Sequence, residues 1–143
     1  MVDEIYKYEK IANIKLTTPI EHKLLLEIAK SLDKGEFILC HRDLQLPNIL
    51  YNGKTLKLID FEYAGFSSIL WELGNLSAEL ELSKEQIHKI ASMYGNISYK
   101  DILKGQLMAN YIWSLWSWFY HKIDLGRSYL LRFHKNLQEL SHL

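Results

Sequence analysis

Residues 41–48 of the chain read HRDLQLPN, and residues 58–62 read LIDFE. Asp43 and Asn48 lie five positions apart on what we expect to be one polar loop, so a carboxylate and an amide oxygen can point into one cavity. Asp60 follows 17 residues after Asp43, at the end of a predicted hairpin, and can reach the same place. Oxygen ligands of this kind suit Mg²⁺, which usually keeps water and substrate phosphates in its shell.

This spacing is typical of phosphoryl transfer by kinases, in which a loop Asp takes or orients the proton of the acceptor hydroxyl. We therefore assign Asp43 to the acceptor, and Asn48 and Asp60 to a magnesium ion that bridges the phosphates of ATP. Converging carboxylates would repel each other without a divalent ion. His41 either holds the loop through hydrogen bonds or acts as a neutral catalytic histidine. An isolated H-x-D is common by chance, and the flanking strand and hairpin favour the kinase interpretation.

The surrounding sequence predicts an α-rich α+β chain, a helical bundle with a small β-hairpin that carries the metal site. A capping box from Thr18 to Glu21 begins a helix that ends at residues 33–35. The apolar residues 37–40 predict a buried strand that leads into the polar loop. We also expect hairpin strands at 49–51 and 56–59 around a turn at Asn52-Gly53, and helices at 69–82, from 83 to near 95, from 98 toward 124 with Gly126 as its stop, and at 126–140.

The segments that follow the loop make the comparison with kinases more specific. Residues 59–65 read IDFEYAG, where protein kinases have D-F-G, and residues 71–75 read WELGN. Both runs resemble the choline/ethanolamine kinase family, which shares the aminoglycoside-phosphotransferase variant of the kinase fold. A third block, IWSLWS at residues 112–117, is similar to the W-x-L-W-S segment of choline kinases. The resemblance covers roughly residues 37–133, with the three blocks in the family's order.

The resemblance implies that Trp113 and Trp116 line a choline pocket. A quaternary ammonium has no N–H group, so it is held by aromatic faces, each contributing roughly 0.5–2 kcal/mol when desolvated, and by a carboxylate. Helical spacing places Trp113, Trp116 and Tyr120 on one face. Glu79 stands where the family has an acidic residue near the ammonium. An aromatic stripe at this spacing can instead belong only to the core, and the role of Tyr120 stays open.

Three further residues are assigned supporting roles at the site. Glu62 either lies near the metal or hydrogen-bonds the loop backbone. At Glu72 the family usually has Asp, which is thought to brace the catalytic loop, and the extra methylene puts that bracing in doubt. Arg42 replaces the small or amide residue that is more usual in these kinases. It either pairs with Glu62 or Glu72 or stays solvated.

Composition indicates a soluble protein with a small-molecule partner. The 17 basic side chains balance 17 acidic ones, so nothing indicates a nucleic-acid partner. Cys40 is the single cysteine and cannot form an internal disulfide, which fits a reducing cytoplasm. The apolar stretch at residues 108–120 is too short and too interrupted to span a bilayer.

We expect residues 1–143 to form one domain, the C-terminal lobe of a protein-kinase-like fold. The sequence shows no glycine-rich loop or strand lysine, so we expect the N-terminal lobe to be absent and ATP to bind the chain alone weakly. A separate N-terminal lobe or a second copy of the chain is the expected protein partner. The expected activity is ATP-dependent phosphorylation of choline or ethanolamine. The alternatives are a kinase of thiamine, methylthioribose or aminoglycosides, and a non-catalytic lobe that binds a small cation.

Overall fold

The structure, a computed structural model, describes residues 1–34 and 36–143. Residue 35, the last of the three residues at which we expected the helix from Thr18 to end, lies outside the described residues. The helices are α1 (Val2–Ala12), α2 (Pro19–Leu32), α3 (Ile69–Glu79), α4 (Lys84–Tyr94), α5 (Tyr99–Phe119) and α6 (Ile123–Ser141), and a short 3₁₀ helix, η1, comprises Leu46–Asn48. The strands are β1 (Phe37–Cys40), β2 (Ile49–Tyr51), β3 (Leu56–Leu58) and β4 (Gly65–Ser68).

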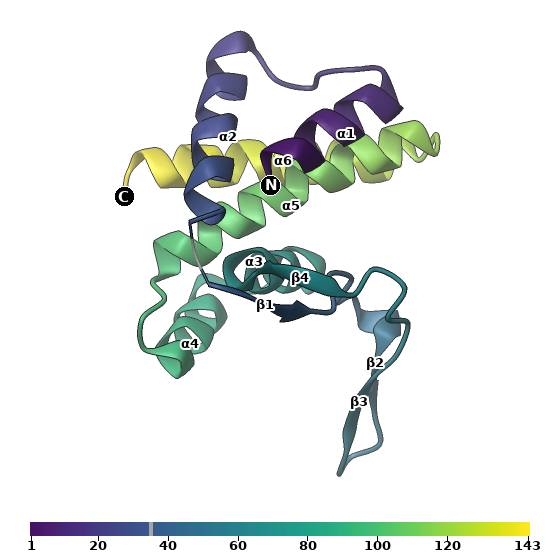
Figure 1. Cartoon of the computed structure of the whole chain (residues 1–143), viewed down its shortest axis with the longest axis vertical. Coiled ribbons are helices and arrows are strands. Elements are labelled where there is room, and N and C mark those ends of the chain that lie inside the picture. The colour runs from purple at the N-terminus through teal and green to yellow at the C-terminus, as the bar shows by residue number, and fades with distance from the viewer. Residues whose placement is uncertain (35) are drawn as a thin grey trace.

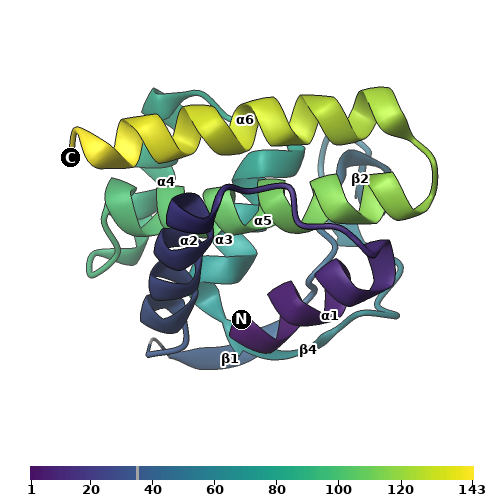
Figure 2. The ribbon, with the colours of Figure 1, turned by 90° about the horizontal axis from the view of Figure 1, so that it is seen from above.

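Helix α5 is the central element, and α1, α2, α3 and α6 pack against it (Figure 1). Figure 2 shows α6 running alongside α5 for most of its length. The side chains of Leu107, Met108 and Leu115 on α5 are fully buried in the main apolar core. Removing such side chains from water is the main driving force for this packing. The core therefore fixes α5, which carries the tryptophan block.

Helix α3 approaches α5 unusually closely because each helix has a glycine at the crossing. A Cβ atom on Gly105 would overlap the carbonyl oxygen of Leu70, and one on Gly74 would overlap the backbone of Gly105. Only glycine therefore fits at these two positions. The close crossing brings the side chains of α3 next to the tryptophans of α5.

The capping residues begin the helices where the sequence predicts. Capping boxes are present at Thr18, Ser83 and Ser98. The predicted helix at 69–82 ends earlier, at Glu79. The prediction that Gly126 stops the long helix is wrong, because α5 is capped at Tyr120 and Gly126 lies inside α6. A Cβ on Gly126 would lie 3.3 Å from the carbonyl oxygen of Ser114, so this glycine allows α6 to approach α5.

Two small antiparallel sheets support the loop between β1 and β2. Strand β1 pairs with β4, with Phe37 opposite Ser68, and β4 was not predicted. The predicted hairpin is present as β2 and β3, which project from the body of the molecule (Figure 1). Its turn has Gly53 at φ 89°, and the Asn52 side chain accepts hydrogen bonds from the two backbone N–H groups that follow Gly53. No helix in the described ranges is long and apolar enough to cross a membrane.

Candidate active site

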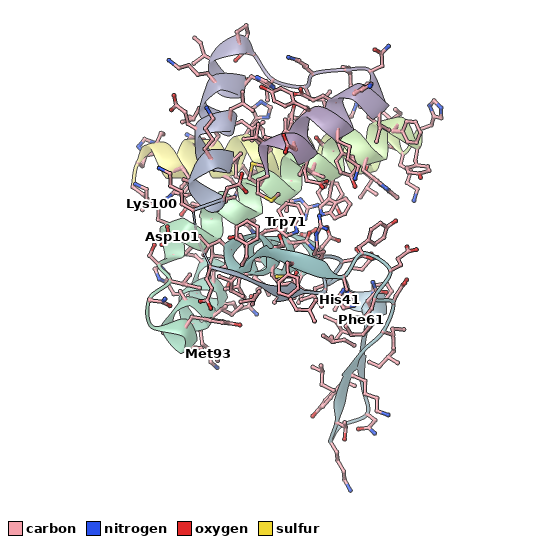
Figure 3. All side chains as sticks on the ribbon, viewed as in Figure 1. His41, Phe61, Trp71, Met93, Lys100 and Asp101 are labelled. Atoms are coloured by element: carbon pink, nitrogen blue, oxygen red, sulfur yellow. The ribbon has the colours of Figure 1, made fainter. Side chains whose placement is uncertain are left out.

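The buried His41 connects the two ends of the hairpin region. Its Nε2 lies 2.8 Å from the carbonyl oxygen of Ile59, which can only accept, so Nε2 carries the hydrogen. Its Nδ1 then accepts from the backbone N–H of Asp43 at 3.3 Å. The ring also packs on Phe61, with 4.6 Å between ring centroids, and both residues lie at the base of the hairpin in Figure 3. With both ring nitrogens bonded to backbone, this geometry favours the bracing role for His41.

The amide of Asn48 holds Asp43 in place. Asn48 Nδ2 donates to the main-chain oxygen and to Oδ2 of Asp43, each at 2.9 Å. Gln45 Nε2 donates to the same Oδ2 at 3.1 Å. Within the described part of the chain, Asn48 Oδ1 and Asp43 Oδ1 accept no hydrogen bond from protein groups. Each residue therefore keeps one oxygen for another ligand.

Asp60 comes two residues after β3 and adopts a left-handed backbone conformation, with φ 65°. Its exposed carboxylate lines the same cavity as Asp43. In the described ranges, no group of three or more His, Cys, Asp or Glu side chains is arranged to hold a metal ion. One or two carboxylates with an amide oxygen nevertheless fit Mg²⁺, which takes its remaining ligands from water and substrate phosphates.

A cavity of about 310 Å³ joins Asp43, Gln45 and Asp60 to the aromatic part of the molecule. Asn48 is buried and is not among the residues that line this cavity. Glu79 of α3 and Trp113 and Trp116 of α5, the residues expected around the ammonium group, line it. Tyr120 does not: it lines a second cavity of about 350 Å³, which shares Tyr8, Tyr63 and Trp116 with the first. The remaining lining residues are Tyr8, Asp43, Gln45, Asp60, Glu62, Tyr63, Lys122, Leu125 and Tyr129.

Helix α3 orients Trp113, and Trp113 packs against Trp116. Trp113 Nε1 donates to Oδ1 of the fully buried Asn75 at 2.7 Å. The rings of Trp113 and Trp116 stand edge to face at 85°, with 6.3 Å between centroids. Sequence reasoning had given no role to Asn75, although it lies in the WELGN block. Its hydrogen bond fixes the plane of one wall of the cavity.

Glu79 is half-buried in the wall of the cavity. Burial raises the pKa of its carboxyl group, while a hydrogen bond from Tyr129 and the charge of Arg132 oppose that shift. Tyr129 Oη donates to Glu79 Oε1 at 2.8 Å. A cation that entered the cavity would favour the ionised form of Glu79.

Glu72 braces the loop despite its extra methylene. Its Oε1 accepts from the N–H of His41 at 2.7 Å, and its Oε2 from the N–H of Arg42 at 2.9 Å. The suggested ion pair of the Arg42 side chain with Glu62 or Glu72 is wrong. The guanidinium group instead pairs with Glu4 on α1, with 3.5 Å between Nη2 and Oε1. Glu62 lines the cavity and makes no hydrogen bond to the loop backbone among the described residues.

Helix α1 contributes Tyr8 to the cavity wall, which sequence reasoning missed. The buried Glu9 anchors this helix, because its Oε1 accepts from Tyr111 Oη at 2.7 Å and lies 2.9 Å from His22 Nε2. Ile5, Tyr8, Glu9 and Ala12 recur at helical spacing, and that pattern could have identified the helix.

Comparison with known proteins gives consistent matches. The family model described as choline/ethanolamine kinase matches residues 5–96. Protein LicA of Haemophilus influenzae is 29% identical over 89 residues, which cover 54% of this chain and 33% of that protein. Ethanolamine kinase 1 of Mus musculus is 42% identical over 40 residues, covering 27% of this chain and 11% of that protein.

Solved structures match almost the whole chain. The crystal structure of choline kinase LicA from Streptococcus pneumoniae matches 99% of it with a TM-score of 0.73 at 23% identity. A structure of LicA in complex with AMP matches with a TM-score of 0.71 at 25% identity. The chain covers 55% and 53% of those two chains, and a third or less of the curated relatives. The predicted α-rich fold, one lobe of a kinase-like structure, is confirmed.

Proposed function

The chain belongs to the choline/ethanolamine kinase family, and from this premise we propose that it binds the acceptor and magnesium in the transfer of the ATP γ-phosphate to the hydroxyl of choline or ethanolamine. The observation that carries the proposal is the single cavity shared by Asp43, Asp60, Glu79 and the two tryptophans. One end of it offers carboxylates suited to phosphoryl transfer, and the other offers aromatic faces and an acid suited to an ammonium group.

The aromatic end supports a small cationic acceptor. Trp113 and Trp116 present differently oriented rings to one space, and Glu79 adds a carboxylate beside them. Cation–π attraction contributes roughly 0.5–2 kcal/mol for each ring, more as the site becomes drier. We propose that these three side chains bind the ammonium group of choline or ethanolamine, which favours these acceptors over the uncharged methylthioribose.

At the other end, Asp43 is proposed to orient the acceptor hydroxyl and receive its proton. The amides of Asn48 and Gln45 hold Oδ2, and Oδ1 remains for the hydroxyl. A correctly placed general base typically contributes about 10²–10⁴-fold to the rate. His41 and Glu72 position the backbone around Asp43 and act only through it.

Asn48 and Asp60 are proposed to hold Mg²⁺ through an amide oxygen and a carboxylate. The ion, when bound with ATP, neutralises charge on the phosphates. Because the chain spans about half of the related structures, we propose that ATP binds chiefly to the other half of the fold. That half is supplied by a separate lobe or by a longer chain, and the reaction is proposed to occur in the cytoplasm.

The test is an assay of ATP- and Mg²⁺-dependent phosphorylation with choline, ethanolamine and thiamine as acceptors. It uses the purified chain, alone and within any longer protein that contains it. We expect phosphocholine or phosphoethanolamine to form, and Asp43→Asn to abolish the product without abolishing choline binding. Turnover of thiamine alone would contradict the acceptor assignment. Choline binding without turnover in any form would indicate a binding module.

A further inference from the structure

One cation already lies on the aromatic wall of the cavity. The ammonium nitrogen of Lys122 is 4.6 Å from the ring centroid of Trp116. This distance is within the range of a cation–π interaction. Lys122 forms no salt bridge with any described residue, although carboxylates line the same cavity. The ring face of Trp116 is therefore where this ammonium lies.

The backbone at the α5–α6 turn places Lys122 beside Trp116. The N–H of Lys122 donates to the carbonyl oxygen of Ser117 at 2.8 Å, and its carbonyl oxygen accepts from Gly126 N at 2.9 Å. The preceding residue, His121, takes a left-handed conformation with φ 57°, which reverses the chain after α5. The side chain of Lys122 is exposed and free to change rotamer, whereas its Cα is fixed by these bonds.

Lys122 is also the one cationic side chain among the described residues that line the cavity. Asp43, Asp60, Glu62 and Glu79 line it from the loop, the hairpin and α3. A second cation entering this space is attracted by the carboxylates and repelled by Lys122. It must also displace the ammonium group of Lys122 from the face of the Trp116 ring.

We propose that Lys122 competes for the ammonium subsite, the part of the cavity lined by Trp113, Trp116 and Glu79. A cationic acceptor displaces the Lys122 ammonium group from Trp116 when it binds. This inference rests on the proposed function and adds a residue that sets acceptor affinity. Occupation by Lys122 lowers the affinity for every ammonium ligand. A small cation that makes few other contacts binds weakly already, so the same loss leaves it unbound, whereas a ligand that also reaches Asp43 and Glu79 stays bound.

The test combines a ligand-free readout with a binding measurement. In the ligand-free chain, proton NMR should show the ε-methylene resonances of Lys122 shifted upfield by the Trp116 ring. The shift should vanish in Trp116→Leu and on titration with choline chloride, but not with sodium chloride. Calorimetric titration with choline should show binding about two- to five-fold tighter in Lys122→Gln. Lys84→Gln is the matched control, because Lys84 lies 4.9 Å from the Tyr99 ring outside this cavity, and its choline affinity should equal that of the wild type.

The outcomes separate the inference from the proposed function. A wild-type chain that binds choline, with Lys122→Gln binding it equally or more weakly, overturns the inference and leaves the acceptor assignment standing. Absence of the upfield shift in the ligand-free chain also overturns the inference alone. A chain that binds neither choline nor ethanolamine in any variant overturns the acceptor assignment, and with it the inference.

Discussion

Replacing Glu72 by alanine removes the carboxylate that holds two consecutive N–H groups of the catalytic loop. Glu72 Oε1 lies 2.7 Å from the nitrogen of His41, and Oε2 lies 2.9 Å from the nitrogen of Arg42. Glu72 and His41 are both buried, so water cannot readily replace the lost acceptor at His41. The substitution should therefore destabilise the fold and release the segment that carries Asp43.

A buried donor left without an acceptor costs about 1–3 kcal/mol. The N–H of Arg42 is only partly buried, which places its share near the lower limit. We expect Glu72→Ala to lower the free energy of unfolding by about 2–4 kcal/mol. Glu72→Gln keeps one acceptor oxygen, but it turns an NH₂ group toward the other N–H. It should lose about 1–2 kcal/mol.

The assay is urea denaturation followed by tryptophan fluorescence, together with hydrogen exchange of the backbone amides of His41 and Arg42. Both amides should exchange faster in Glu72→Ala. The control is Glu27→Gln, which makes the same charge change as Glu72→Gln at an exposed position on α2. This control should stay within about 0.5 kcal/mol of the wild type.

A Glu72→Ala variant that unfolds at the wild-type urea concentration, with unchanged exchange at His41 and Arg42, would show that Glu72 does not hold the loop. A loss of stability without faster exchange at these amides would place the role of Glu72 in the packing of α3, and the loop would then be held by other contacts.

Three further predictions concern the cavity and the helix crossing. Burial raises the pKa of the Glu79 carboxyl group, so the folded state loses stability as the pH rises through that pKa. Glu79→Gln should therefore resist urea better than the wild type at pH 7. Equal stability of the two proteins at pH 7 would contradict this prediction. The advantage should disappear below about pH 4. Gly105→Ala should lower the free energy of unfolding by about 2–3 kcal/mol in thermal melts, because the new methyl group meets the carbonyl of Leu70; a gain, as helix propensity alone would give, would be the contrary result. Asp60→Asn should weaken Mg²⁺ binding in calorimetry while choline still binds, and unchanged Mg²⁺ affinity would exclude Asp60 as a ligand.

Local signals in the sequence predicted much of the fold. The capping boxes at Thr18, Ser83 and Ser98 each join residues three apart. A motif this local does not depend on the rest of the fold, so it marks where a helix begins. The hairpin was likewise recognisable from Asn52-Gly53 and its apolar flanks. Strand β4 could not be predicted in this way, because its partner β1 lies far away in the sequence. Gly126 was misread because a glycine that ends a helix and one that lets two helices approach are the same residue in the sequence.

At the site, too, features set by neighbouring residues could be predicted, and contacts between distant segments could not. The sequence predicted that Asp43 and Asn48 precede the hairpin and that Asp60 follows it, as they do in the structure. Spacing could not predict that Glu72 reaches two N–H groups, because its reach depends on how α3 approaches the loop. Nor could it show that Lys122 folds back over Trp116, which follows from the turn after α5. Helical spacing put Tyr120 on the tryptophan face, and its ring does pack on Trp116 with 4.6 Å between centroids. It nevertheless lines the second cavity and not the one that contains Asp43.

We propose that the cavity holds an amino alcohol, with its ammonium group at the tryptophans and its hydroxyl group near Asp43. The most direct measurement is the set of proton nuclear Overhauser effects between bound choline and the chain. We predict contacts from the choline N-methyl protons to the indole protons of Trp113 and Trp116. Bound choline whose methyl protons contact neither ring would contradict the account.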